Sequence, residues 1–303
     1  MLKSALYLVP TPIGNLEDIT LRAVNVLREA TLIAAEDTRH SRILLEHLGL
    51  GAARMMSCYD QVEEQRAGAI IEEIKKGGSV ALISDAGSPL INDPGYKVVA
   101  TCLQAGLEVV PLPGPCALIT ALEAAALPAH RFMFAGFLPV KQKELEQTLR
   151  ALEHADYTAV FYESPRRIRN TCEAMAALLP QRQVALCREL TKEFESFYRM
   201  EAAKLPGYLD ADPNRCRGEF VVVIGPAEQA PSGPGPEVAE ALKMLLPFVP
   251  VKTAAAALSL AGRGQRRELY RLALKLMKTS QGCSRSQEEE PPEAEQPAKG
   301  VAR

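Results

Sequence analysis

Short apolar runs alternate with helical stretches through residues 6–126, and this alternation constrains the fold more than any other feature. The apolar runs fall at residues 6–9, 31–35, 79–84 and 107–112, and the helical patterns fall at residues 19–30, 39–48, 62–76, 95–104 and 115–126. Strands and helices that alternate at this spacing predict βαβ units, in which the strands run parallel. Several runs are wholly apolar, which is typical of strands that helices cover on both faces.

The pattern changes after residue 127, where Pro128 marks a boundary. Further strands are predicted at residues 132–137, 157–162, 184–187, 195–200 and 219–224, and helices at 141–153 and 165–179. The last strands have no long helices between them, and parallel strands need long connections. We therefore expect a second α/β domain whose sheet is mixed, with an antiparallel portion.

The chain of 303 residues ends in segments of different composition. Residues 226–237 are rich in Pro, Gly and Ser and are predicted to be a linker. A small helical module is expected at residues 238–279, and the polar segment 280–303 is expected to be disordered. The predicted fold is thus two α/β domains, residues 1–127 and 128–225, followed by this module.

Charge is distributed unevenly along the chain. The formal net charge is −2, which excludes a globally basic nucleic-acid coat protein. Residues 251–278 nevertheless hold seven basic residues and one acid. A helix, a glycine turn and a basic helix are expected there, as in a helix-turn-helix, and phosphate contacts would give the module affinity for RNA. A basic face that keeps the module soluble and packs on the enzyme is the alternative. The predicted RNA-binding residues of the module are Arg263, Arg266, Arg267 and Arg271.

Several classes of protein are disfavoured by what the sequence lacks. No Cys-x-x-Cys pair occurs among the seven cysteines, and none of the four histidines is at ligand spacing with a cysteine, so no metal site is predicted. Neither a dinucleotide-binding GxGxxG pattern nor a phosphate-binding GxxxxGK[ST] loop is present. There is no signal-peptide pattern and no apolar run near the ~20 residues that span a bilayer, so a cytoplasmic protein without a membrane partner is expected.

Three loops rich in glycine and proline follow predicted strands of the first domain. They are PTPIGN at residues 10–15, SDAGSP at 84–89 and PGPCA at 113–117. Loops at the carboxyl ends of parallel strands line the ligand crevice of an open α/β sheet. Glycine lets the backbone approach a ligand, and free N–H groups bind carboxylates or phosphates. Each loop alone is compatible with a simple tight turn, but three together predict a ligand site.

Longer segments around these loops carry a resemblance to a known family. In chain order they are LYLVPTPIGNLEDITLRA, AAEDTRHSR, ISDAGSPLINDPG, PLPGPCALITAL, FAGFLP, FYESPRRI and CRELTKEFE. Together they resemble the methyltransferases of small-subunit ribosomal RNA within the tetrapyrrole methylase fold family, over residues 6–278. The resemblance implies that S-adenosyl-L-methionine lies in the cleft between two α/β domains. It also implies a homodimer that methylates the ribose 2′-oxygen of a cytidine in the decoding region of 16S rRNA.

The resemblance assigns a set of residues to the cofactor. The second and third loops match the family's cofactor loops, and four further residues would form walls of the cleft. Asp85 is the most informative carboxylate, although an Asx turn or a helix cap explains it equally well. The predicted cofactor-binding residues are Ser84, Asp85, Ala86, Gly87, Ser88, Pro115, Cys116, Ala117, Phe134, Ala135, Phe161 and Tyr162.

The substrate side of the cleft is predicted from the first loop and from charged clusters. Catalytic roles are predicted for Asp37, Arg39, Glu189 and Lys192, because a nearby base or cation helps a ribose hydroxyl to lose its proton. A helix cap for Asp37 or Thr38, and a surface salt-bridge set for the Glu189–Lys192 pair, are the alternatives. The remaining predicted RNA contacts are Pro12, Gly14, Asn15, Arg42, Arg166 and Arg167.

Two other functions stay open at the level of sequence. A precorrin-type methyltransferase of the same fold would act on a small macrocycle and would not need the basic module. A non-catalytic RNA-binding assembly protein would not need three glycine loops around one cleft. Binding of S-adenosylmethionine separates the second alternative from the others.

Overall fold

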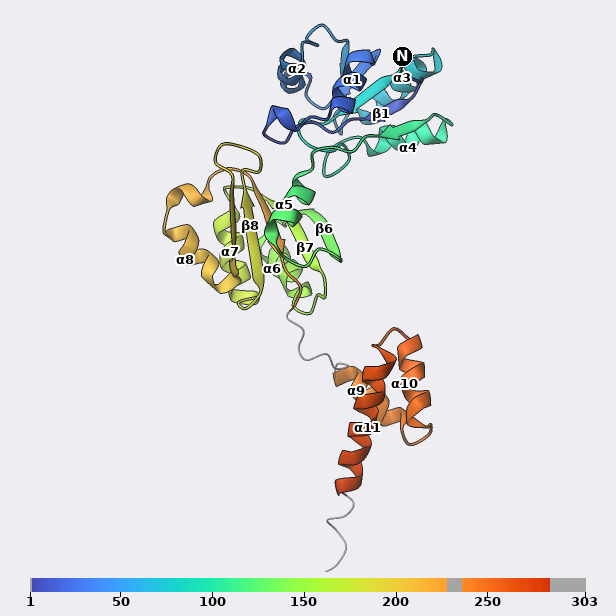
Figure 1. Cartoon of the computed structure of the whole chain (residues 1–303), viewed down its shortest axis with the longest axis vertical. Helices are drawn as coiled ribbons and strands as arrows, with labels where there is room; N and C mark the ends of the chain where they lie inside the picture. Colours follow the sequence, from blue (N-terminus) through green and yellow to red (C-terminus); the bar gives the residue numbers. More distant parts are fainter. Residues whose placement is uncertain (1, 228–235, 284–303) are drawn as a thin grey trace, which may run out of the picture. The chain divides into compact units, whose positions relative to one another are not determined.

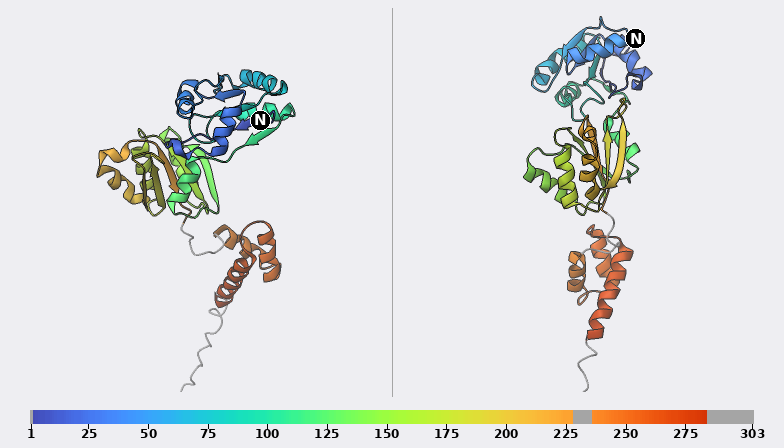
Figure 2. Two further views of the ribbon diagram at one scale, coloured as in Figure 1. Left: turned by 45° about the horizontal axis from the view of Figure 1, so that its top comes forward. Right: turned by 90° about the vertical axis from the view of Figure 1, so that its left-hand side faces the viewer.

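The computed structural model describes residues 2–227 and 236–283. The chain divides into two compact units, Met1–Glu228 and Gln229–Arg303 (Figure 1). The first unit contains two sheets with their helices, which form two successive lobes in Figure 2. The predicted linker and the predicted C-terminal tail lie largely outside the described residues.

The first sheet is entirely parallel, which confirms the prediction from the alternating pattern. Its strand order is β3-β2-β4-β1-β5. Its strands are β1 (Leu6–Leu8), β2 (Leu32–Ala35), β3 (Met55–Ser57), β4 (Val80–Ile83) and β5 (Val109–Pro111). No apolar run marks β3 in the sequence, because it is a half-buried edge strand of three residues.

Helices cover both faces of this sheet. On one face lie α1 (Leu21–Glu29) and α2 (Thr38–His47), which bury Val26, Leu27 and Leu45. On the other face lie α3 (Glu63–Lys75) and α4 (Tyr96–Gln104). The strands between them are therefore buried on both sides, and this explains why their sequences are apolar throughout.

The second sheet is mixed, as predicted. Its order is β6-β7-β10-β8-β9, in which β6 and β7 are parallel and the other neighbours are antiparallel. The strands are β6 (Phe132–Phe137), β7 (Thr158–Glu163), β8 (Gln183–Arg188), β9 (Ser196–Glu201) and β10 (Phe220–Ile224). One face packs against α6 (Gln142–Ala151), α7 (Ile168–Leu178) and α8 (Leu205–Asp210). Short 3₁₀ helices among the described residues are η1 (Leu16–Asp18), which follows β1 of the first sheet, and η2 (Ala202–Lys204) and η3 (Pro213–Cys216), which flank α8.

The helix α5 (Ala117–Ala125) packs on the second sheet, although the sequence places it in the predicted domain 1–127. Its side chains Leu118 and Ala121 share a core with Val160 of β7 and Val223 of β10. Figure 1 accordingly shows α5 beside β6 and β7. The difference arises because an apolar helix face does not reveal in the sequence which of two sheets it will cover.

The second unit is a small bundle of α9 (Pro236–Leu245), α10 (Val251–Leu260) and α11 (Arg266–Cys283). Its core includes Leu242, Ala254 and Leu269. The turn between α10 and α11 contains Gly262 and Gly264, both with positive φ, a backbone conformation that favours glycine. The predicted helix, glycine turn and basic helix are therefore present, and α11 continues into the segment predicted as the tail.

Candidate active site

The three glycine loops meet at the carboxyl edge of the first sheet. Thr11 and Gly87 exchange two backbone hydrogen bonds of 2.9 Å each, which join the first loop to the second. The Ser88 hydroxyl donates a hydrogen bond of 3.1 Å to the Pro115 carbonyl, which joins the second loop to the third. The loops thus form one continuous rim, as their positions after neighbouring strands predict.

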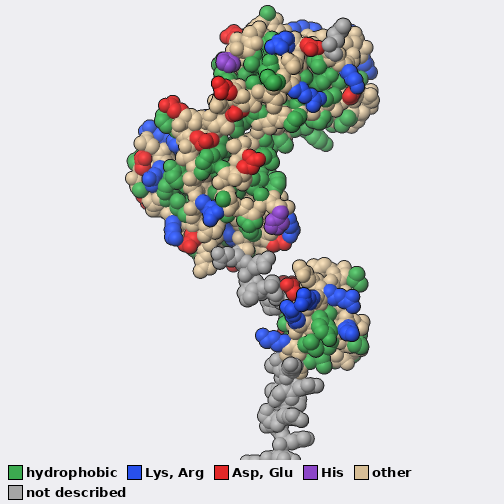
Figure 3. Space-filling view, viewed as in Figure 1, with side chains coloured by type: hydrophobic (Ala, Val, Ile, Leu, Met, Phe, Trp, Pro, Cys, Tyr) green, Lys and Arg blue, Asp and Glu red, His purple; other side chains and the backbone are tan. Residues whose placement is uncertain are grey.

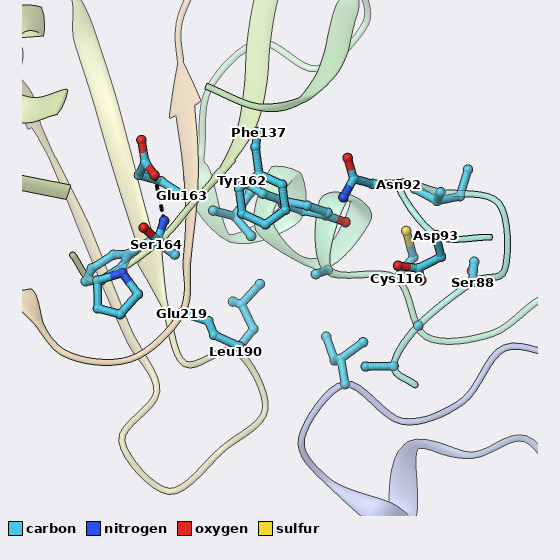
Figure 4. Close-up of a pocket in the computed structure, with 18 residues that line it drawn as sticks. Ser88, Asn92, Asp93, Cys116, Phe137, Tyr162, Glu163, Ser164, Leu190 and Glu219 are labelled. Atoms are coloured by element: carbon cyan, nitrogen blue, oxygen red, sulfur yellow. Dashed lines mark hydrogen bonds between the residues drawn. The ribbon is translucent and has the colours of Figure 1, made fainter. Parts of the chain in front are cut away.

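A cavity of about 380 Å³, which we call the main cavity, lies between this rim and the second sheet. Ala86, Gly87 and Ser88 line it from the second loop, and Cys116 and Ala117 from the third. In Figure 4, Ser88 and Cys116 lie on one side of the cavity, while Tyr162 and Phe137 lie toward the second sheet. Six of the twelve predicted cofactor residues line this cavity, including Tyr162.

Aromatic side chains of β6 and β7 form the wall on the second sheet. The Tyr162 ring lies 4.9 Å from that of Phe134 and 5.7 Å from that of Phe137, between ring centroids. Phe137 lines the cavity, whereas Phe134 packs behind Tyr162 and Ala135 lies outside the cavity. The sequence does not indicate Phe137 because a bulge between residues 134 and 137, with Gly136 at φ 67°, breaks the alternation.

Phe161 does not lie where the sequence predicts it. Its side chain is buried among the residues of α6 and α7, on the face of the second sheet that points away from the cavity. Successive side chains of a strand point to opposite faces, so Phe161 and Tyr162 cannot both line one cleft. Pro115 also lies outside the cavity lining, where its carbonyl accepts the bond from Ser88.

The polar groups of the main cavity suit a ligand that carries both a positive and a negative charge. Burial, and next the negative charge of Glu36, raise the pKa of the Asp93 carboxyl to about 6, so Asp93 is a carboxylate at neutral pH. The helix α5 begins at Ala117 without a side-chain cap, and an uncapped helix N-terminus favours an anion. A carboxylate, the N-terminus of α5 and an aromatic wall together fit the cationic, carboxylate and adenine parts of S-adenosylmethionine.

The turn after β7 is held in place by a buried ion pair. The Glu163 carboxylate, whose side chain is 1 % exposed, lies 2.7 Å from Nη2 of Arg167. It also accepts hydrogen bonds of 2.7 Å from the Thr171 hydroxyl and the Ser164 N–H. The side chain of Arg167 is therefore part of the scaffold of the cavity, and its contact with RNA phosphates stays a prediction.

A second cavity of about 320 Å³, which we call the side cavity, opens beside the main one. The two cavities share Ile13, Ala86 and Glu219 in their walls. The predicted cofactor residues Ser84 and Asp85 line this side cavity instead of the main one. The first loop contributes Pro12 and Gly14 to this side cavity, and that this loop lies nearer the substrate stays a prediction.

Asp85 joins two loops of the first sheet. Its Oδ1 accepts a hydrogen bond of 3.1 Å from the Asp37 N–H, and its own N–H donates one of 3.3 Å to Oε2 of Glu36. Burial raises the pKa of the Glu36 carboxyl, and the hydrogen bond from Asp85 opposes this. Asp85 thus ties the end of β4 to the beginning of α2.

Lys192 lies between two carboxylates at the edge of the side cavity. Its Nζ is 3.2 Å from Oε1 of Glu189 and 2.7 Å from Oε2 of Glu219. Burial alone would lower the pKa of Lys192, but the two carboxylates outweigh it and raise that pKa. Lys192 is therefore a protonated ammonium at neutral pH and cannot act as a base. The sequence does not single out Glu219. It directly precedes β10, whose first residue, Phe220, pairs with Glu163 at the end of β7.

The other predicted catalytic pair lies outside both cavities. The Asp37 carboxylate accepts a hydrogen bond of 2.8 Å from the Arg39 N–H and caps α2. It also forms an ion pair of 2.8 Å with the largely exposed Arg39 guanidinium. This interaction holds the pKa of the Asp37 carboxyl well below its usual range. The helix-cap alternative thus describes the position of Asp37 in the structure.

The predicted RNA contacts are mostly exposed. Arg166 is exposed, and Arg42 donates a hydrogen bond of 3.1 Å to the Gly51 carbonyl. Asn15 caps η1 with its side chain. Within the described residues, no ion pair joins a carboxylate to any of Arg263, Arg266, Arg267 and Arg271. Lys and Arg side chains are visible on the helical module in Figure 3.

Comparison with known proteins agrees with this fold. The family model of the Tetrapyrrole (Corrin/Porphyrin) Methylases matches residues 5–206, and the chain belongs to this family. Solved structures of the fold include a cobalt precorrin-4 methyltransferase of cobalamin biosynthesis, with a TM-score of 0.55 and 16 % identity over 73 % of this chain and 95 % of that one. The uroporphyrin-III-C-methyltransferase of Thermus thermophilus gives a TM-score of 0.51 and 22 % identity over 73 % of this chain and 93 % of that one.

Curated relatives that are much closer in sequence share one name. The protein named Ribosomal RNA small subunit methyltransferase I of Escherichia coli O157:H7 is 45 % identical over 89 % of this chain and 94 % of its own length. The protein of the same name from Mesorhizobium japonicum is 44 % identical over 92 % of this chain and 94 % of its own length. Within the tetrapyrrole methylases, the chain is similar to this group over nearly its whole length.

Two features of the described residues bear on ligands and partners. Among residues 2–227 and 236–283, no set of three or more His, Cys, Asp or Glu side chains is arranged to hold a metal ion. No helix in the same ranges has the length and hydropathy needed to cross a membrane.

Proposed function

We propose that the chain is an S-adenosylmethionine-dependent methyltransferase that methylates the ribose 2′-oxygen of a cytidine in the decoding region of 16S rRNA. The observation that carries this proposal is the pair of cavities with a shared wall, which can hold a methyl donor and an acceptor side by side. Relatives at 44–45 % identity are named for methylation of small-subunit ribosomal RNA. The ribose 2′-oxygen of cytidine is the acceptor that the resemblance of the motifs implies.

The main cavity is the proposed cofactor site. Asp93 would face the cationic part of S-adenosylmethionine, and the uncapped start of α5 at Ala117 would bind its carboxylate. Tyr162 and Phe137 would cover its adenine. When it is bound, the cofactor supplies an electrophilic methyl group on a sulfonium. The residues around it hold donor and acceptor in line and exclude water.

The acceptor hydroxyl needs help to lose its proton, and Lys192 with Glu219 can provide it. We assign to the Lys192 ammonium the stabilisation of negative charge on the ribose oxygen. Glu219 borders both cavities, and we assign to its carboxylate the acceptance of the proton. Glu189 is a positioning residue, because it holds Lys192 and also accepts a hydrogen bond of 2.8 Å from the Glu219 N–H.

The helical module is the proposed anchor for the RNA backbone. Arg263, Arg266, Arg267 and Arg271 are exposed and unpaired with carboxylates within the described residues, so they are available to phosphates. Neutralising phosphates releases counterions and gives affinity that does not depend on sequence. The substrate is ribosomal, so we place the reaction in the cytoplasm.

A homodimer is also part of the proposal. The edge strand β6 exposes Phe132 and Met133, and Val140 follows it, also exposed. Exposed apolar edge strands are normally covered in the native state. We assign this surface to a second copy of the chain. Met133→Glu would place a charge in this interface, so the sedimentation coefficient should change from that of a dimer to that of a monomer.

The decisive experiment combines ribose-methylation mapping with substitution of Lys192. The wild-type protein with S-adenosylmethionine should add one 2′-O-methyl mark to unmethylated small ribosomal subunits. Lys192→Met should lower kcat by about 100-fold, while calorimetry shows an unchanged affinity for the cofactor. Methylation of a tetrapyrrole instead of RNA would support the precorrin alternative, and absence of cofactor binding would support a non-catalytic protein.

A further inference from the structure

We infer that the side cavity receives the target nucleoside itself, extruded from the RNA, with its base against α2 and its ribose at the wall shared with the main cavity. This inference rests on the proposed function and adds to it the place and chemistry of substrate recognition. It assigns the substrate-reading role to Ser41 and Ile43, for which the sequence gives no signal.

The size and position of the side cavity fit one nucleoside. Its volume of about 320 Å³ is at the lower end of the range for small-molecule sites. It lies between the first loop and the start of α2, and it meets the main cavity at Ala86 and Glu219. An acceptor ribose at this meeting point would lie next to the methyl donor.

The charges around the side cavity favour the uncharged part of a nucleotide. Lys192 is its one lysine or arginine among the described residues, and it is already paired with Glu219. Asp85 and Glu219 add two carboxylates to the lining. A phosphate in this cavity would therefore meet net negative charge, whereas a base and a ribose would find donors and acceptors.

The walls of the side cavity are aliphatic. Leu16 and Ile43 stand partly exposed at its edge, with Pro12 and Leu44 beside them. Enzymes that extrude a base hold it between aromatic or apolar side chains and read it with a few hydrogen bonds. The side cavity has the apolar part of this arrangement, and the imidazole of His40 is the one aromatic ring among its described lining residues.

Ser41 supplies the unsatisfied polar group that such a site needs. It lines the side cavity from α2, is 3 % exposed, and its Oγ has no hydrogen-bond partner within the described residues. Buried hydroxyls are nearly always hydrogen-bonded, so an unpaired one at a cavity points to a partner supplied by a ligand. An exocyclic amino or carbonyl group of a pyrimidine can be that partner.

The first test fills the cavity from its exposed edge. Ile43 is 64 % exposed, so Ile43→Trp can add bulk at the opening without disturbing the core. With unmethylated small ribosomal subunits and S-adenosylmethionine, kcat/KM should fall at least about 10-fold, while cofactor affinity by calorimetry stays within about twofold. Leu103→Trp is the matched control, because Leu103 is 58 % exposed on α4 and lines neither cavity. That control should keep the wild-type kcat/KM.

The second test removes the Ser41 hydroxyl. Because Oγ has no partner among the described residues of the free protein, Ser41→Ala should leave thermal stability unchanged or higher. The KM for the ribosomal subunit should nevertheless rise about 10-fold, with little change in kcat, as expected for one lost hydrogen bond to the bound substrate. An unchanged KM in a stable Ser41→Ala protein would overturn the role of Ser41.

A third measurement reports on extrusion directly. An RNA fragment with the fluorescent base pyrrolo-cytosine at the methylated position should brighten on binding the wild-type protein, because the base leaves its stack. Ile43→Trp should abolish this increase. A wild-type protein that methylates without any fluorescence increase would overturn this inference but not the proposed function. An Ile43→Trp protein with full activity would do the same. A wild-type protein that binds no cofactor or methylates no ribosomal subunit would instead contradict the proposed function.

Discussion

The backbone N–H of Asn15 donates a hydrogen bond of 3.1 Å to the side-chain hydroxyl of Thr191, and so joins the first loop to the loop between β8 and β9. Thr191 and Glu189 both adopt a positive φ, which is uncommon for residues other than glycine. Strained backbone of this kind persists only where surrounding contacts hold it. The contact with the first loop thus helps to position Lys192 at the edge of the side cavity.

Gly14 is the residue that permits this contact. A Cβ at residue 14 would lie 2.5 Å from Cγ of Lys192 and 3.0 Å from the Leu190 carbonyl oxygen. Gly14→Ala should therefore displace the loop that carries Lys192 and lower kcat by about 100-fold, since a misplacement of about 1 Å can have that effect. The measurement is the methylation rate at saturating cofactor and RNA.

The matched control for this change is Gly68→Ala. A Cβ at residue 68, in the middle of α3, would meet nothing within 4 Å. Replacing a glycine inside a helix by alanine should raise the free energy of unfolding by about 1 kcal/mol and leave the rate unchanged. Equal rates for both variants would show that the contact of Gly14 does not position Lys192.

Asp93 should make cofactor binding depend on pH. Its pKa is raised to about 6, mainly by burial, so the carboxylate forms as the pH rises through that value. Affinity for the cationic cofactor should therefore increase from pH 5 to pH 7.5. Calorimetry on Asp93→Asn should show weaker binding at pH 7.5 and a flatter profile, whereas Asp18→Asn, at an exposed carboxyl outside both cavities, should match the wild type.

The Asp93 carboxyl should also make the free energy of unfolding depend on pH. The folded pKa of about 6 exceeds the ordinary value of 3.8, so the folded state binds more protons than the unfolded state between these values. The contribution of Asp93 to the free energy of unfolding should thus fall as the pH rises from about 4 to about 6 and stay constant above. Urea unfolding of Asp93→Asn should lack this decline. Identical pH profiles for the two proteins would mean that Asp93 titrates normally.

The arginines of the helical module should control the salt dependence of RNA binding. Replacing Arg263, Arg266, Arg267 and Arg271 by alanine should reduce the slope of log affinity against log salt by about 3, at about 0.7 for each phosphate contact on unpaired RNA. Cofactor affinity should not change. Deleting residues 238–303 should have the same two effects. Lys243→Ala is the control and should keep the wild-type slope, because the Nζ of Lys243 is paired with Glu240 at 2.8 Å. A wild-type slope for the fourfold arginine variant would exclude the module as the RNA anchor.

Glu63 should stabilise the loop that leads to Asp93. It is 4 % exposed and accepts hydrogen bonds of 2.9, 2.8 and 3.3 Å from the N–H groups of Gly95, Lys97 and Val98. Glu63→Ala leaves these donors unpaired and should lower the free energy of unfolding by about 3 kcal/mol in urea titrations. Glu64→Gln, at a neighbouring exposed carboxylate, should change it by less than about 0.5 kcal/mol. Similar losses of unfolding free energy in both variants would argue against a stabilising role for the hydrogen bonds of Glu63.

Much of the fold could be predicted because it depends on local patterns. The parallel first sheet follows from apolar runs such as residues 79–84 and from the helices between them. The antiparallel part of the second sheet follows from short connections between its strands, because two parallel strands need a long crossover connection. The rim of glycine loops follows in turn, because parallel strands all end at one edge.

The motifs that resemble the family gave the direction of individual side chains less well than they gave the loops. The sequence motif places Phe161 and Tyr162 together at the cofactor, yet the pleat sends Phe161 into the core of α6 and α7. The bulge at Gly136 turns Phe137, and not Ala135, toward the main cavity.

The sequence by itself determined which elements form, where the glycine loops follow the strands, and that a basic module follows the two α/β domains. Only the tertiary structure decided that α5 packs on the second sheet, that Ser84 and Asp85 line a separate cavity, and that Lys192 lies between Glu189 and Glu219. The reason is physical. Secondary structure depends on propensity and periodicity over a few residues, whereas cavities and charge pairs depend on contacts between residues far apart in the chain, which no local pattern encodes.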